Sequence, residues 1–79
     1  MSLSATLARF VDMLDDVPDF PFQADLRAVK TALDEHFPMS PEEAGRLLRT
    51  LVDGARDMPG FIFGDDLAEA ERVLIRYNF

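Results

Sequence analysis

The sequence predicts an all-α fold: a compact domain of four helices with short connections. Apolar residues recur at steps of three and four in four separate stretches, which is the spacing of one helix face. Prolines and glycines separate these stretches, as expected for helix boundaries. With 79 residues, the chain is expected to form a single domain over positions 1–79. A domain of this size has a modest core.

The first two helices are expected at about 3–16 and 22–36. Ser2 or Ser4 can cap the first helix, and Pro18 is expected to stop it because proline restricts the residue before it. The apolar stripe of the first helix is Leu3, Leu7, Phe10, Val11, Leu14 and Val17. The stripe of the second helix is Phe22, Leu26, Val29, Leu33 and Phe37.

The third helix, at about 41–56, has the clearest start signal. Ser40 can accept a hydrogen bond from the backbone N–H of Glu43, and the Glu43 side chain can return one to Ser40. Pro41 occupies the first helical position, where its missing N–H has no cost. Gly45 is unfavourable in a helix by about 1 kcal/mol relative to alanine, so it suggests a close helix–helix approach. We expect either Gly54 or the Met58-Pro59-Gly60 turn to end this helix.

The fourth helix is expected at about 65–77, with Asp65 or Asp66 as its N-cap. Acidic residues follow in its early part and arginines near its C-terminus, which suits the helix dipole. Its apolar positions are Leu67, Ala70, Val73, Leu74 and Tyr77, whereas Ile75 lies off this stripe.

Three large apolar residues, Phe61-Ile62-Phe63, stand together in the connection before the fourth helix. They could cover the open end of the core, form a short strand at 61–63 in an α+β fold, or contact a partner. Successive side chains cannot all face one core in a regular conformation. We therefore expect Phe63 to be buried and Phe61 or Ile62 to face outward, forming a partner surface with Phe20 or Phe22.

Fifteen acidic residues against eight basic ones give a formal charge of −7, which opposes direct binding of nucleic acid. Five aspartates lie between Arg9 and Arg27 without an intervening cation: Asp12, Asp15, Asp16, Asp19 and Asp25. They form either a solvated face that keeps the protein soluble or a docking surface. The sequence has no cysteine, no signal peptide and no apolar run long enough for a membrane span. A cytoplasmic protein without membrane contact is the expectation.

The sequence offers little catalytic chemistry. His36 is the only histidine and is expected to cap or decorate the end of the second helix. Adjacent carboxylates such as Asp65 and Asp66 point about 100° apart on a helix and do not chelate one ion together. Arg46, Arg49 and Arg56 form a basic stripe, which is either a solvated face or an anion contact. We expect no catalytic residue, no metal ligand and no cofactor.

The sequence therefore favours a small acidic protein–protein interaction module without catalytic activity: an adaptor, an inhibitor or immunity-type factor, or an assembly subunit. Its partner is expected to be another protein with a basic surface, or a second copy in a homodimer. The residues expected to bind it are Asp12, Asp15, Asp16, Asp19, Phe20, Phe22, Phe61 and Ile62. The alternative is a nucleic-acid mimic that blocks a DNA- or RNA-binding enzyme, and a helical bundle with a small-molecule pocket is the third interpretation.

Overall fold

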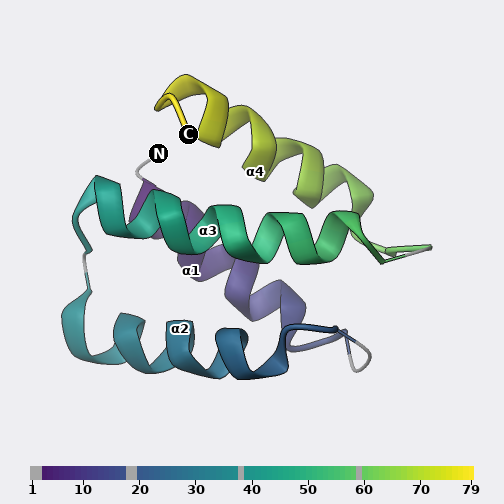
Figure 1. The fold of residues 1–79 in the computed structure, drawn as a ribbon, viewed down its shortest axis with the longest axis horizontal. Coiled ribbons are helices and arrows are strands. Elements are labelled where there is room, and N and C mark those ends of the chain that lie inside the picture. Colours follow the sequence, from purple (N-terminus) through teal and green to yellow (C-terminus); the bar gives the residue numbers. More distant parts are fainter. Residues whose placement is uncertain (1–2, 18–19, 38, 59) are drawn as a thin grey trace.

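The computed structural model, which describes residues 3–17, 20–37, 39–58 and 60–79, contains four helices that alternate in direction along the chain (Figure 1). They are α1 (Leu3–Leu14), α2 (Gln23–His36), α3 (Pro41–Arg56) and α4 (Gly64–Arg76). The predicted all-α fold is confirmed. The alternative α+β fold is wrong, because residues 61–63 lie in a turn and the described part of the chain contains no strand.

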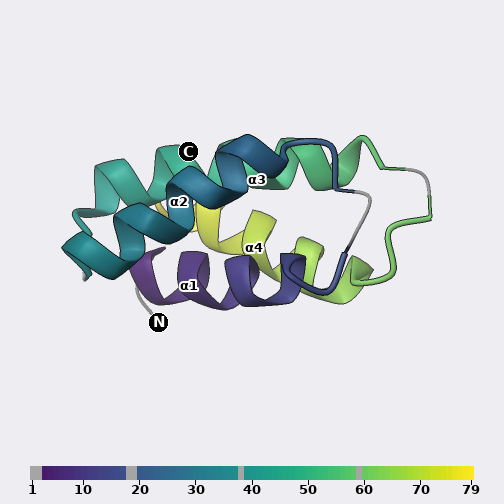
Figure 2. The same cartoon turned by 90° about the horizontal axis from the view of Figure 1, so that it is seen from below.

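Helices α1 and α3 form the centre of the domain, since each of them packs against all three other helices. In the described part of the chain, α2 packs only on α1 and α3 and makes no contact with α4. Figure 2 shows α2 and α3 on one side of the molecule and α1 and α4 on the other. The largest side chains that are almost completely buried between them are Phe20, Leu3, Leu7, Leu14, Leu48, Leu51, Leu74 and Val52.

Of the N-terminal caps predicted for α3 and α4, the first is present in the structure and the second is not. The predicted cap of α3 is confirmed: Ser40 Oγ accepts a hydrogen bond of 3.3 Å from the Glu43 N–H. The prediction that Asp65 or Asp66 caps α4 is wrong. The helix begins earlier, because the Leu67 N–H donates to the Phe63 carbonyl at 3.0 Å. Both aspartates therefore lie in the first turn, where they favour the helix dipole without capping it.

Ser4 is a second correction, because it does not cap α1. It lies inside the helix and is 3% exposed, and its Oγ accepts a 3.0 Å hydrogen bond from the backbone N–H of Met39. This bond ties α1 to the connection between α2 and α3, which is 35 residues away in the sequence. The helix ends at Leu14, two residues earlier than predicted. Ser2 and Pro18, expected to start and stop it, lie outside the described residues.

The two glycines of α3 make room for aromatic rings. A Cβ atom on Gly45 would overlap the ring of Phe79, and one on Gly54 would overlap the ring of Phe22. Gly45 thus marks the approach of a ring and not of another helix, and α3 continues past Gly54 to Arg56. The Phe22 ring also packs edge-to-face on Phe20, with ring centroids 6.1 Å apart.

The turn after α4 explains how Phe79 reaches α3. Asn78 has a φ of 66°, in the left-handed region that asparagine tolerates. The Phe79 N–H donates to the Leu74 carbonyl at 2.9 Å, and the Asn78 N–H donates to the Ile75 carbonyl at 3.0 Å. This pair of bonds is the Schellman motif, which closes a helix end and reverses the chain. The reversal brings Phe79 back over Gly45.

Ser4 and Thr6 are both buried hydroxyl residues of α1, but Thr6 Oγ1 has no hydrogen-bond partner. Ser4→Ala should lower the free energy of unfolding by about 1–3 kcal/mol, because it leaves the buried Met39 N–H unsatisfied. Thr6→Val has nearly the same shape and removes only an unpaired hydroxyl, so stability should stay the same or rise. Urea unfolding measures both variants. Equal losses would show that the Ser4–Met39 bond contributes nothing specific.

Gly45→Ala should reveal the space that the Phe79 ring occupies. In a Phe79→Ala background, the alanine should raise the free energy of unfolding by about 1 kcal/mol through helix propensity. With Phe79 present, this gain should be lost, because the added methyl group displaces the ring. Denaturant unfolding of the four proteins in this double-mutant cycle measures the difference. The same gain in both backgrounds would contradict the packing of Phe79 on α3.

Candidate protein-interaction surface

The connections at residues 15–22 and 57–63 lie at the same end of the domain, as the two views show together (Figures 1 and 2). We call the described residues of these two segments the connector end. Phe22 of the first segment lies beside Gly54 of α3, three residues before the second segment begins. The structure thus brings together most of the residues that the sequence predicts for partner binding. Asp19 is one of the predicted residues but lies outside the described residues.

The aromatic residues of the connector end differ in exposure. Phe20 is only 2% exposed, so it belongs to the core and offers no surface to a partner, contrary to the expectation from sequence. Its ring packs edge-to-face on Phe22, and both rings lie beside Gly54 of α3. Phe22 itself remains 36% exposed. Of the two phenylalanines of the first segment, only Phe22 therefore contributes apolar surface.

In the second segment, Ile62 is the residue that faces outward. It is 73% exposed, the largest value among the exposed large hydrophobic residues of the described chain. Phe61 and Phe63 are both half-buried and pack edge-to-face, with ring centroids 6.1 Å apart. Phe63 is thus less buried than predicted, because it shares the edge of the core with Phe61. The exposed Ile62 is thus flanked in the sequence by two half-buried phenylalanines.

The predicted acidic residues do not form one continuous face. Asp16 is exposed at the start of the first connection. The Asp15 carboxylate forms an ion pair with the Lys30 ammonium on α2. Asp12 lines a groove between α1 and α2 instead of facing the connector end. Of these three residues, Asp16 is therefore the one that leaves a charge at the connector end without compensation from a described ion pair.

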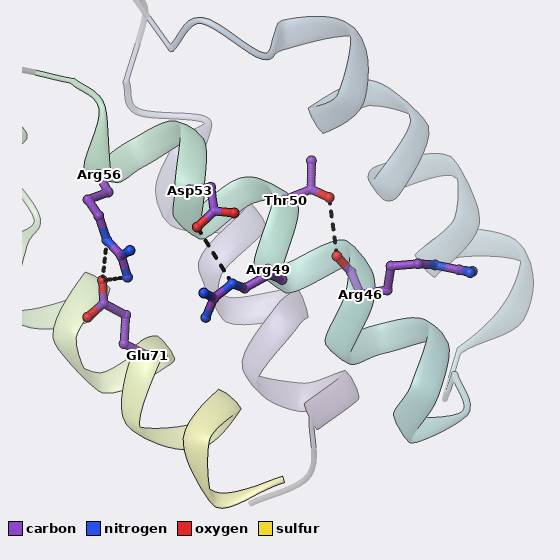
Figure 3. A network of polar contacts seen from close by, with 6 residues as sticks. All are labelled: Arg46, Arg49, Thr50, Asp53, Arg56 and Glu71. Carbon is purple, nitrogen blue, oxygen red and sulfur yellow. Dashed lines mark hydrogen bonds and ion pairs between the residues drawn. The ribbon is translucent and has the colours of Figure 1, made fainter. Parts of the chain in front are cut away.

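Two of the three arginines of the α3 stripe, Arg49 and Arg56, form ion pairs with carboxylates of the same chain (Figure 3). Arg56 donates from Nε (3.1 Å) and Nη2 (2.6 Å) to the same Glu71 oxygen, which joins α3 to α4. The hydrogen bond and the charge of Glu71 raise the pKa of Arg56 above its ordinary value. Arg49 lies 3.6 Å from Asp53 on the same helix. These contacts support the interpretation of the stripe as a solvated, internally paired face.

A small cavity of about 100 Å³ lies between α1 and α4. Apolar and charged side chains share its lining: Thr6, Arg9, Phe10, Met13, Asp66, Glu69 and Ala70. Although Thr6 lines this cavity, its Oγ1 atom is buried within the protein and makes no hydrogen bond. The cavity is too small for a drug-sized ligand, since such pockets usually measure about 300–1,000 Å³.

The described part of the chain presents no constellation typical of a catalytic or metal site. His36 is exposed and lies 3.8 Å from Glu35. No group of three histidine, aspartate or glutamate side chains within the described ranges could hold a metal ion. None of the helices described has the length and apolar character needed to cross a membrane.

Sequence reasoning missed several exposed apolar residues. Phe37 at the end of α2 is 57% exposed, and Ile75 on α4 is 69% exposed. The position of Ile75 off the apolar stripe was the available signal for its exposure. Phe37 gave no such signal, because it continues the stripe of α2 at helical spacing.

No family model, no curated protein and no solved structure matches this chain.

Proposed function

We propose that this protein is a small, non-catalytic binding module that docks on another protein through its connector end. The observation that carries the proposal is the exposure of Ile62, at 73%, between the two half-buried rings of Phe61 and Phe63. Burying an isoleucine side chain that is otherwise exposed is worth about 1.5–3 kcal/mol. An exposed residue of this kind on a short connection is a suitable anchor for an interface.

Charge complementarity favours a partner with a basic surface. The connections at 15–22 and 57–63 contain four aspartates and no lysine, arginine or histidine. The chain as a whole carries a formal charge of −7. An apolar anchor with acidic residues around it suits a partner whose apolar contact has a basic rim, since such complementarity raises the association rate and excludes unsuitable partners.

Two other interpretations receive less support. A nucleic-acid mimic needs acidic groups spread over one surface, whereas Arg49 and Arg56 interrupt the acidic residues on α3. A homodimer brings two chains of charge −7 together, and this repulsion opposes self-association. We therefore propose a basic partner protein and retain these two interpretations as outcomes of the tests.

Ile62→Ser should abolish partner binding and leave the domain folded. Ile75→Ser is the matched control, because Ile75 is 69% exposed but lies on α4, away from the connector end. The measurement is affinity capture from the native host with quantitative mass spectrometry, together with thermal unfolding of each variant. We expect one protein to be retained by the wild type and Ile75→Ser and lost with Ile62→Ser. Equal retention by all three would exclude Ile62 as the anchor.

The acidic residues at the connector end should control the rate of association. Asp15→Asn combined with Asp16→Asn should slow association with the captured partner more than it speeds dissociation, and added salt should have the same effect. The control, Glu35→Gln with Glu42→Gln, removes the same charge near the opposite connection, which joins α2 to α3 (Figure 1). Surface plasmon resonance measures both rates. An association rate that does not respond to salt would contradict a basic partner, and competition with DNA would support the mimic.

A further inference from the structure

Helix α2 leaves part of its apolar stripe uncovered. Leu26 and Val29 are buried, at 3% and 2% exposure, but Leu33 is only half-buried and Phe37 is 57% exposed. The reason is the position of α2 at the side of the domain, where it packs only on α1 and α3 among the described elements. The C-terminal end of α2 therefore leaves Phe37 and part of Leu33 exposed, although Leu33 also packs against the core.

These side chains line a groove between α1 and α2, with an open volume of about 350 Å³. Ala8 and Val11 of α1 and Leu33 of α2 contribute apolar lining, and Phe37 adds its ring just beyond the end of α2. Helices α1 and α2, whose side chains line the groove, run in opposite directions (Figure 2). A groove of this kind between two helices matches the apolar face of a third helix.

The charged residues of the groove indicate the chemistry of its occupant. Asp12, Lys30 and Asp34 contribute its polar lining. The Lys30 ammonium forms an ion pair with Asp15, so its charge is already compensated. Within the described residues, Asp12 and Asp34 form no ion pair, one carboxylate on each helix. The groove thus combines apolar and charged lining, and each of its two helices contributes one carboxylate that forms no ion pair within the described residues.

We propose that the α1–α2 groove binds an amphipathic helix of a basic partner protein, with its apolar residues on Leu33 and Phe37 and its lysines or arginines beside Asp12 and Asp34. A second copy of this chain is a poorer occupant, because it also carries a charge of −7 and the repulsion between two such chains opposes self-association. The groove is a second docking surface in addition to the connector end, so the proposal does not rest on the role of Ile62.

The test uses a synthetic 18-residue peptide, designed as a helix with leucine on one face and lysine on the other. Titration into the ¹⁵N-labelled protein should give saturable binding, with the largest amide shifts in α1 around Ala8 and Asp12 and in α2 from Lys30 to Phe37. Phe37→Ala should weaken binding roughly tenfold or more, as expected when an aromatic anchor of an interface is truncated. Asp12→Asn combined with Asp34→Asn should weaken binding and reduce its dependence on salt.

Two controls make the outcome specific. Ile62→Ser and Ile75→Ser should leave the affinity for the peptide unchanged, since both residues lie outside the groove lining. A peptide with glutamate in place of every lysine should bind much more weakly. Absence of saturable binding, equal affinity for the acidic peptide, or shifts confined to the connector end would overturn the proposal. Phe37 is already 57% exposed, so an unchanged thermal midpoint is expected for its alanine variant and would exclude unfolding as the cause of weaker binding.

Discussion

Every other element of this domain packs, directly or through an aromatic ring, on helix α3. Ala44, Leu48, Leu51, Val52 and Ala55 are fully buried along it and provide the surface on which α1, α2 and α4 meet. Its two glycines admit the rings of Phe22 and Phe79 from segments outside the helices. A small domain buries a limited share of its surface, so rings from its connections and its end add area that four short helices do not supply.

The repetition of apolar residues predicted the four helices well, because one buried stripe on each helix is enough to build this core. Local polar contacts were harder to predict. Ser40 bonds to its own helix and was identified, whereas Ser4 bonds to Met39, which no spacing rule in the sequence connects to it. The start of α4 was misplaced because its N-cap is Phe63, which packs against the core and makes no side-chain capping hydrogen bond, so no capping residue marks the boundary in the sequence.

For the candidate surface, sequence reasoning placed the relevant segments but not the burial of each side chain. The expectation that one residue of Phe61-Ile62-Phe63 faces outward follows from backbone geometry, and Ile62 occupies that position. Phe20 is buried beside Phe22 and beside Gly54 of α3, which is distant in the sequence, so its burial could be recognised only in the folded structure. The surroundings of the acidic residues also could not be predicted from the sequence. Asp12, Asp15 and Asp16 are close in sequence, but Asp12 lines the groove between α1 and α2, whereas Asp15 forms an ion pair with Lys30.

The central position of α1 has a consequence for folding during synthesis on the ribosome. This helix precedes its packing partners in the chain, and its contacts with α3 and α4 form only after those later helices have been synthesised. Until then Leu7 and Phe10, which the finished domain buries at 0% and 3% exposure, have incomplete cover. The apolar side chains of this segment therefore stay without their packing partners until α4 has been synthesised, and the core of the domain is completed only then.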